Sequence, residues 1–211
     1  MSRKLAHVAG AALASVLLLG GCAAGTHPGA AAVVGGTEIS VGDVDQTSEA
    51  VGKALGQPFT AATTLSELVN SALVAQVADQ RSITVSDAEI TPAMKAVVGD
   101  QAVYEKFVAD PVANVFLRDV AKAAIGTIKL GGGTGITDPN VQQAQQAGLV
   151  ALRDASKNIE VDIAPRFGKW SDGRIDGKVS GSLSEESAQA KAKREAAEQQ
   201  QQQQQPQQPQ G

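Results

Sequence analysis

The hydrophobic residues in the middle of the chain recur every three or four positions, the spacing that places them on one face of an α-helix. The clearest run follows Thr64, which together with Glu67 has the spacing of a helix capping box. The predicted apolar face contains Leu65, Leu68, Val69, Ala72, Leu73 and Val77, with Gln76 among them. We therefore expect a long amphipathic helix in this region.

Helix-start signals predict further helices on both sides of this one. A residue that favours the N-cap position opens each of them, at Ser40, Ser86, Asp100, Asp110 and Asp138. The first is expected to end near Gly56, and Pro92 is expected to kink or restart the second. The helix that begins at Pro111 carries apolar residues at Val112, Val115, Phe116, Val120 and Ala123.

Strand patterns are few and stand at the two ends of the helical region. Residues 32–39 contain a short apolar run and a Gly35-Gly36 pair suited to a turn, and residues 159–163 alternate between apolar and acidic side chains. Pairing these segments would join the two ends of the domain. The predicted fold class is mainly α, with a small two-stranded β element joining the N- and C-terminal segments.

The first residues have the layout of a signal peptide. Arg3 and Lys4 precede an apolar stretch over residues 5–19 that is too short for a permanent membrane span. The following Leu19-Gly20-Gly21-Cys22 resembles the lipobox of bacterial lipoproteins. That resemblance implies cleavage after residue 21 and lipid attached to Cys22, which would anchor the protein at the extracytoplasmic face of the cell membrane.

Composition divides the rest of the chain into three parts. Residues 22–31 are small and contain Gly and Pro, which predicts a flexible tether. Residues 173–211 end in a Gln- and Pro-rich run and hold too few large hydrophobes to fold alone, so we expect a disordered tail. Residues 32–172 remain as one folded domain of about 140 residues, long enough to bury about two-thirds of its surface.

The inventory of reactive side chains excludes several function classes. Cys22 is the sole cysteine, and His27, in the tether, is the sole histidine after cleavage. Ser-His or Cys-His catalysis and a His-based metal site are therefore excluded from the domain. Loss of Arg3 and Lys4 changes the net charge from −4 to −6, and without a basic patch nucleic acid is not an expected partner.

Two local patterns suggest ligand binding but lack its remaining parts. The segment Gly131–Gly135 has neither the Gly-Lys-Ser/Thr of a phosphate loop nor the spacing of a dinucleotide loop, which favours a flexible surface loop. The acidic pairs Asp43/Asp45 and Asp87/Glu89 stand in first turns of predicted helices, where caps and dipole partners are expected. We predict no catalytic residue, no metal and no cofactor.

The few aromatic residues are the candidate peptide contacts. In the cluster of residues 165–170, Phe167 and Trp170 stand beside two cations, which suits either a peptide-contact patch or a terminal latch packed on the helices with Arg166 paired to an acid. The candidates are Phe59, Tyr104, Phe107, Phe116, Phe167 and Trp170, with Val103 and Val108 beside them. For each of them, burial in the core is the favoured alternative.

Three segments, in order along the chain, also carry a family resemblance. They are residues 32–40 with Val44, then residues 68–78 as a long helix followed by the element Ile83-Thr-Val-Ser-Asp-Ala-Glu-Ile90, and last residues 159–170 with Pro-Arg-Phe-Gly-Lys-Trp. In this order they resemble the N-terminal domain of the SurA periplasmic chaperone family, in the lipoprotein form of actinobacteria. Members often insert a parvulin-type prolyl isomerase domain before the closing segment, where this chain has only residues 126–137.

The resemblance implies a chaperone-like module without the enzyme, in which an apolar groove binds unfolded or exported polypeptides. Two alternatives stay open at this point: a non-enzymatic structural or adaptor lipoprotein of the cell envelope, suggested by the tail, and a degenerate prolyl isomerase. A solute-binding lipoprotein is disfavoured, because one domain of this size does not readily supply two lobes around a ligand. Whether the domain forms a homodimer is also open.

Overall fold

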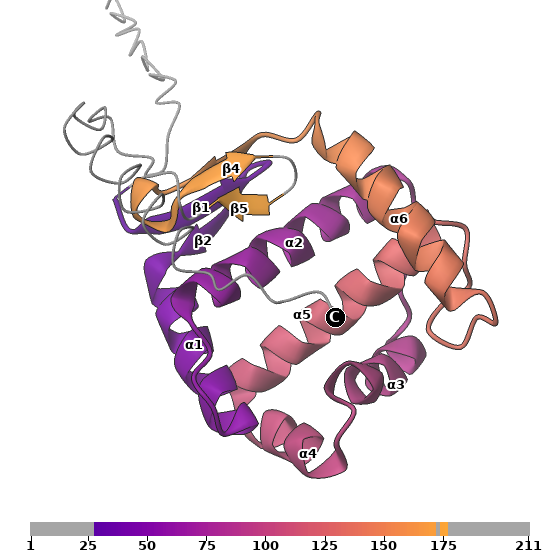
Figure 1. Cartoon of the computed structure of the whole chain (residues 1–211), viewed down its shortest axis with the longest axis horizontal. Helices are drawn as coiled ribbons and strands as arrows, with labels where there is room; N and C mark the ends of the chain where they lie inside the picture. The colour runs from indigo at the N-terminus through magenta and orange to yellow at the C-terminus, as the bar shows by residue number, and fades with distance from the viewer. Residues whose placement is uncertain (1–27, 172–173, 177–211) are drawn as a thin grey trace, which may run out of the picture.

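The computed structural model of the chain describes residues 28–171 and 174–176 (Figure 1). The predicted signal peptide, Cys22, most of the predicted tether and residues 177–211 lie outside the described residues. The described part is mainly helical with a small antiparallel sheet, which confirms the predicted fold class. The helices are α1 (Val41–Leu55), α2 (Ala61–Gln80), α3 (Asp87–Val98), α4 (Gln101–Ala109), α5 (Pro111–Leu130) and α6 (Val141–Ser156).

The sheet joins the two ends of the domain, as the sequence predicts. Strand β1 (Ala30–Val34) lies between β2 (Thr37–Ser40) and β3 (Val161–Ile163), antiparallel to both. Strand β1 begins at Ala30, two residues before the expected start of the domain. A further hairpin of β4 (Lys169–Ser171) and β5 (Arg174–Asp176), which the sequence did not predict, follows the 3-10 turn η1 (Pro165–Phe167).

Most helices begin where their caps predict. The Asp43 carboxylate accepts hydrogen bonds from the Ser40 backbone N–H and hydroxyl, and α1 ends at Gly56 in the left-handed conformation that glycine adopts readily. Asp110 caps α5 through the backbone N–H groups of Val112 and Ala113. Pro92 does not restart the helix, since α3 continues through it.

Two predicted helix starts are wrong. Helix α2 begins a turn early, because Thr60 is its N-cap and Thr64 is buried with its hydroxyl donating to the Thr60 carbonyl. Glu67 is therefore not a cap partner, and its partial burial raises the pKa of its carboxyl. Helix α6 begins at Val141 rather than at Pro139, because the Asp138 carboxylate accepts hydrogen bonds from the backbones of Thr134 and Asn140 and so stabilises a preceding turn.

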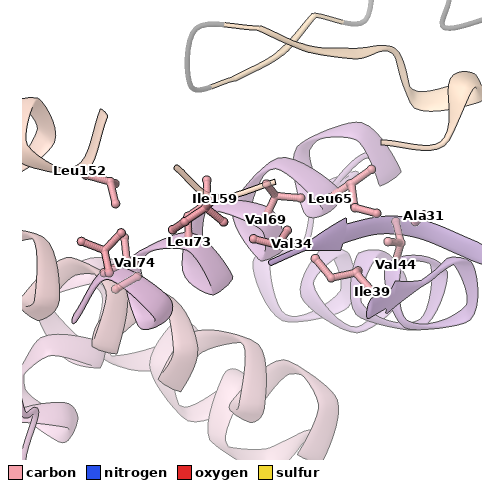
Figure 2. Close-up of a cluster of buried hydrophobic side chains, with 13 residues drawn as sticks. Ala31, Val34, Ile39, Val44, Leu65, Val69, Leu73, Val74, Leu152 and Ile159 are labelled. Carbon is pink, nitrogen blue, oxygen red and sulfur yellow. The ribbon is translucent and has the colours of Figure 1, made fainter. Parts of the chain in front are cut away.

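The core consists of two clusters that meet at α5. The first fills the space between the sheet and α2, with Leu152 of α6 at one end (Figure 2). The second lies among α1, α3, α4 and α5. Both contain side chains of α5, Ala123 in the first cluster and Leu117 in the second. Burial of these apolar groups is the main stabilising contribution available to a domain with no cysteine pair.

Helices α5 and α6 pack at backbone distance. Gly148 of α6 lies against the Thr127 carbonyl of α5, and Gly131 lies against the backbone of Ala144, so that a β-carbon at either glycine would collide with main-chain atoms. The predicted Gly131–Gly135 loop therefore has a packing role at its first residue. The glycines allow a close helix–helix contact that larger residues would prevent.

Candidate functional site

Helices α2 and α5 lie side by side across the middle of the molecule (Figure 1). They run in the same direction: Phe59, just before α2, packs on Phe116 near the start of α5, while Val74 packs on Gly126 further along. Two hollows of about 490 and 500 Å³ open along this pair of helices. They are the candidate functional site.

The first hollow lies along the C-terminal halves of α2 and α5. The segment that follows α2 forms one wall, through the half-buried side chains of Ile83 and Val85. Most of the lining atoms are apolar. The lining residues are Thr37, Leu68, Ser71, Ala72, Val74, Ala75, Ala78, Asp79, Ile83, Val85, Asp119, Lys122, Ala123 and Gly126.

The second hollow lies along the N-terminal half of α5, beside α1 and β2. Its floor includes Phe116, and its α5 rim includes Val112 and Val115, which are exposed. The lining residues are Glu38, Ile39, Asp43, Gln46, Thr47, Leu68, Pro111, Val112, Val115, Phe116 and Asp119.

The two hollows adjoin, because Leu68 and Asp119 line both. We call this surface the α2–α5 groove. From Val112 to Gly126 the groove follows α5 for about 21 Å, at a rise of about 1.5 Å per residue. An extended polypeptide advances about 3.3 Å per residue, so the groove has the length of about six extended residues.

One wall of the groove is held to α5 by an ion pair. The Lys129 ammonium lies 2.7 Å from the Glu89 carboxylate and donates to the Thr84 carbonyl at 2.8 Å. The Lys129 ammonium, together with the Ser86 backbone N–H and hydroxyl, lowers the pKa of Glu89 to about 2. These bonds attach the segment that carries Ile83 and Val85 to the end of α5.

The opposite end is held by packing around Phe59. Its ring meets the ring of Phe116 edge-on, with centroids 5.8 Å apart, and its carbonyl accepts a hydrogen bond from the Ser48 hydroxyl. The Gln76 amide meanwhile donates to the Val34 carbonyl, which ties α2 to the sheet. The groove walls are therefore fixed to the rest of the domain by contacts outside the groove.

The groove is acidic at its rim. Among the described residues that line it, Glu38, Asp43, Asp79 and Asp119 carry carboxylates and Lys122 is the one base, 3.5 Å from Asp119. In the described part of the chain, no buried side-chain polar atom lacks a hydrogen-bond partner. The floor therefore offers apolar contact, and the charges lie around it.

The aromatic residues predicted as peptide contacts do not form one surface. Phe107, with 3 % exposure, is in the core and cannot touch a peptide in this conformation. Phe116 is buried but contributes to the groove floor, whereas the half-buried Phe59 packs behind it. Tyr104 is half-buried on α4, with the Lys95 ammonium 5.3 Å from its ring centre. Val103 packs on the core beside it, and Val108 is exposed.

The C-terminal aromatic pair has the arrangement expected of a latch. Phe167 and Trp170 are half-buried and pack against the first core cluster, and neither is among the residues that line the groove. The Arg166 guanidinium stacks over the Phe167 ring at 4.6 Å, in place of the acid partner that the latch interpretation gave it. Packing of this segment holds the end of the domain to its beginning.

Apart from Phe116, the residues that define the groove were not among the predicted contacts. Val112 and Val115 were predicted only as apolar residues of a helix, yet they lie on a different side of α5 from Leu117 and Ala121, which are buried. The signal was present in the sequence: apolar residues of α5 occupy more of its circumference than one buried face needs.

No candidate metal cluster is present in the part of the chain that the structure describes. Within residues 28–171 and 174–176, no three His, Cys, Asp or Glu side chains are grouped to hold a metal ion. Among the same residues, no helix combines the length and apolar character needed to cross a membrane.

Comparison with known proteins adds no relative. No family model, no curated protein and no solved structure matches the chain. The resemblance to the SurA N-terminal domain therefore stays a prediction, and the groove is interpreted from its own geometry.

Proposed function

We propose that this protein is a chaperone-like module that holds unfolded or exported polypeptides in the α2–α5 groove. The observation that carries the proposal is the groove itself: two adjoining apolar hollows, with Val112 and Val115 exposed beside a buried Phe116. Exposed apolar surface rimmed by polar residues is typical of interaction sites. The sequence resemblance to a chaperone domain points to the same class of partner.

The predicted lipid at Cys22 complements this proposal. A lipid-anchored domain would present the groove at the extracytoplasmic face of the membrane, where exported chains emerge before they fold. Within the proposal the protein needs no catalytic residue and no cofactor, because binding to an apolar floor uses contact and burial alone. The same anchor would keep the module close to its clients.

Two valines of nearly equal exposure give a matched test. Val115 is 60 % exposed in the groove, and Val150 is 61 % exposed on α6, outside the groove. The test uses residues 22–211 with Cys22→Ser and measures suppression of the aggregation of a chemically unfolded client. We expect the parent protein to delay aggregation, Val115→Lys to lose most of this effect, and Val150→Lys to retain it.

Circular dichroism and urea unfolding show whether both variants fold. Equal suppression by the two variants would mean that the groove is not the binding surface. An absence of suppression by the parent protein, at a several-fold molar excess over the client, would contradict the proposed function.

A further inference from the structure

The charges around the groove indicate which polypeptides it accepts. Four carboxylates face one ammonium along its described lining, and that ammonium already has Asp119 as a neighbour. Glu38 and Asp43 line the second hollow, Asp79 lines the first, and Asp119 lines both. A ligand that fills the apolar floor of either hollow therefore has negative charge beside it.

From this arrangement we propose that the groove selects extended segments of about six apolar or neutral residues that are flanked by Lys or Arg. This inference rests on the proposed function and adds the class of segment that is bound. The floor would bury the apolar side chains, and the flanking cations would meet the carboxylates of the rim. Acidic flanks would be repelled by the same carboxylates.

The other candidate occupants fit this surface less well. A second copy of residues 22–211 has a net charge of −6, so an acidic groove disfavours it. The chain's own residues 177–211 have equal numbers of acids and bases, and Val179 and Leu183 are their only large apolar residues. A cationic and apolar segment of another polypeptide complements the groove in both charge and polarity.

Three fluorescent peptides with the same apolar centre test the proposal by fluorescence anisotropy. One carries Lys and Arg flanks, one Ser and Gln flanks, and one Asp and Glu flanks. With residues 22–211 bearing Cys22→Ser, we expect the basic peptide to bind about tenfold more tightly than the acidic one at low salt. This ratio should fall to about threefold or less at 0.5 M NaCl, because salt screens exposed charges.

A charge-neutralised variant assigns the preference to the groove. Glu38→Gln/Asp79→Asn/Asp119→Asn should reduce the basic-to-acidic ratio to about twofold or less while still binding the neutral peptide. The matched control, Glu105→Gln/Asp154→Asn/Glu160→Gln, removes three carboxylates elsewhere and should keep the full ratio. Loss of the ratio in both variants would place the preference in the overall charge and would overturn the proposal.

The remaining outcomes separate this inference from the proposed function. Equal binding of all three peptides would overturn the charge preference and leave polypeptide binding in place. If none of the peptides binds, both fail. A dimer seen by light scattering that Val115→Lys dissociates, with no peptide binding, would assign the groove to a second copy and contradict both.

Discussion

Helix α5 has two faces that are built from similar apolar residues, and one face is buried while the other is exposed. On one face, Leu117 and Ala121 are buried against α1, α3 and α4, and further along Gly148 of α6 touches the α5 backbone. On the other face, Val112 and Val115 are exposed at the rim of the α2–α5 groove. The same apolar chemistry thus produces a close-packed core on one side and an open surface on the other.

The difference lies in what the neighbouring elements provide. Glycines allow α6 to approach α5 until backbone meets backbone, which leaves no room for a ligand. On the groove side, the ion pair of Lys129 with Glu89 and the packing of Phe59 on Phe116 fix the walls without filling the space between them. Apolar residues on a helix therefore predict that the face packs against something. The neighbouring elements determine whether that face is buried inside the domain or left open at the surface.

The largest expected difference between the two faces is in stability. Leu117→Ala removes a side chain that is 2 % exposed and leaves a cavity, so the free energy of unfolding should fall by about 3 kcal/mol. Val115→Ala, two residues away on the exposed face, should change it by less than about 0.5 kcal/mol. Urea unfolding measures both. Similar losses would mean that Val115 is part of the core.

The next largest effect on stability is expected at the glycine contact between α5 and α6. There a Gly-to-Ala change should destabilise the protein, the opposite of what helix propensity predicts. Gly-to-Ala changes within helices normally stabilise by about 0.5–1 kcal/mol. Gly148→Ala should instead destabilise by about 2 kcal/mol, because its methyl group meets the Thr127 carbonyl. Gly42→Ala in α1, whose methyl group would meet no atom closer than 3.6 Å, is the control and should be neutral or stabilising. Thermal and urea unfolding report both changes.

The stability contributed by the ion pair that attaches the groove wall to α5 should depend on pH. Because the folded-state pKa of Glu89 is about 2, below its ordinary value of 4.5, the ion pair with Lys129 contributes its full stability above pH 4.5. That contribution should be lost as the pH falls from 4.5 to 2. Since the pair is partly exposed, we expect about 1–2 kcal/mol.

Glu89→Gln tests this pH dependence. Urea unfolding should show a deficit of that size at pH 7 which narrows steadily below pH 4.5. Glu105→Gln on α4 should show less than about 0.5 kcal/mol at every pH. A deficit for Glu89→Gln that persists unchanged at pH 2.5 would mean that packing, rather than the carboxylate charge, is lost in the variant.

The architecture was predictable from the sequence because its signals are local. Ser40 with Asp43, Asp100 and Asp110 cap helices where their side chains indicate, and the alternation near residue 161 predicts the strand that pairs with β1. The start of α2 was mispredicted because Thr60 competes with Thr64 as the N-cap, and the start of α6 because the Asp138 carboxylate is used in the preceding turn. Local patterns do not rank such competitors.

The groove was less predictable because it depends on tertiary packing. The aromatic residues Phe107, Phe167 and Trp170 were predicted as peptide contacts, but they pack in or against the core clusters. In the sequence, Val112 and Val115 do not differ from other apolar helix residues. They line a hollow only because α1, α2 and β2 pack around them. The excess of apolar positions around α5 is the one sequence feature that indicates a second apolar face.

The most direct test of the account is to map bound polypeptide on the two faces. Methyl NMR spectra of residues 22–211 with Cys22→Ser, recorded with and without a Lys/Arg-flanked apolar peptide, report on leucine and valine side chains across the molecule. The account predicts shifts at Leu68, Val85, Val112 and Val115, with Leu149 and Val150 of α6 unchanged. Shifts confined to α6, or no shift at a saturating peptide concentration, would contradict it.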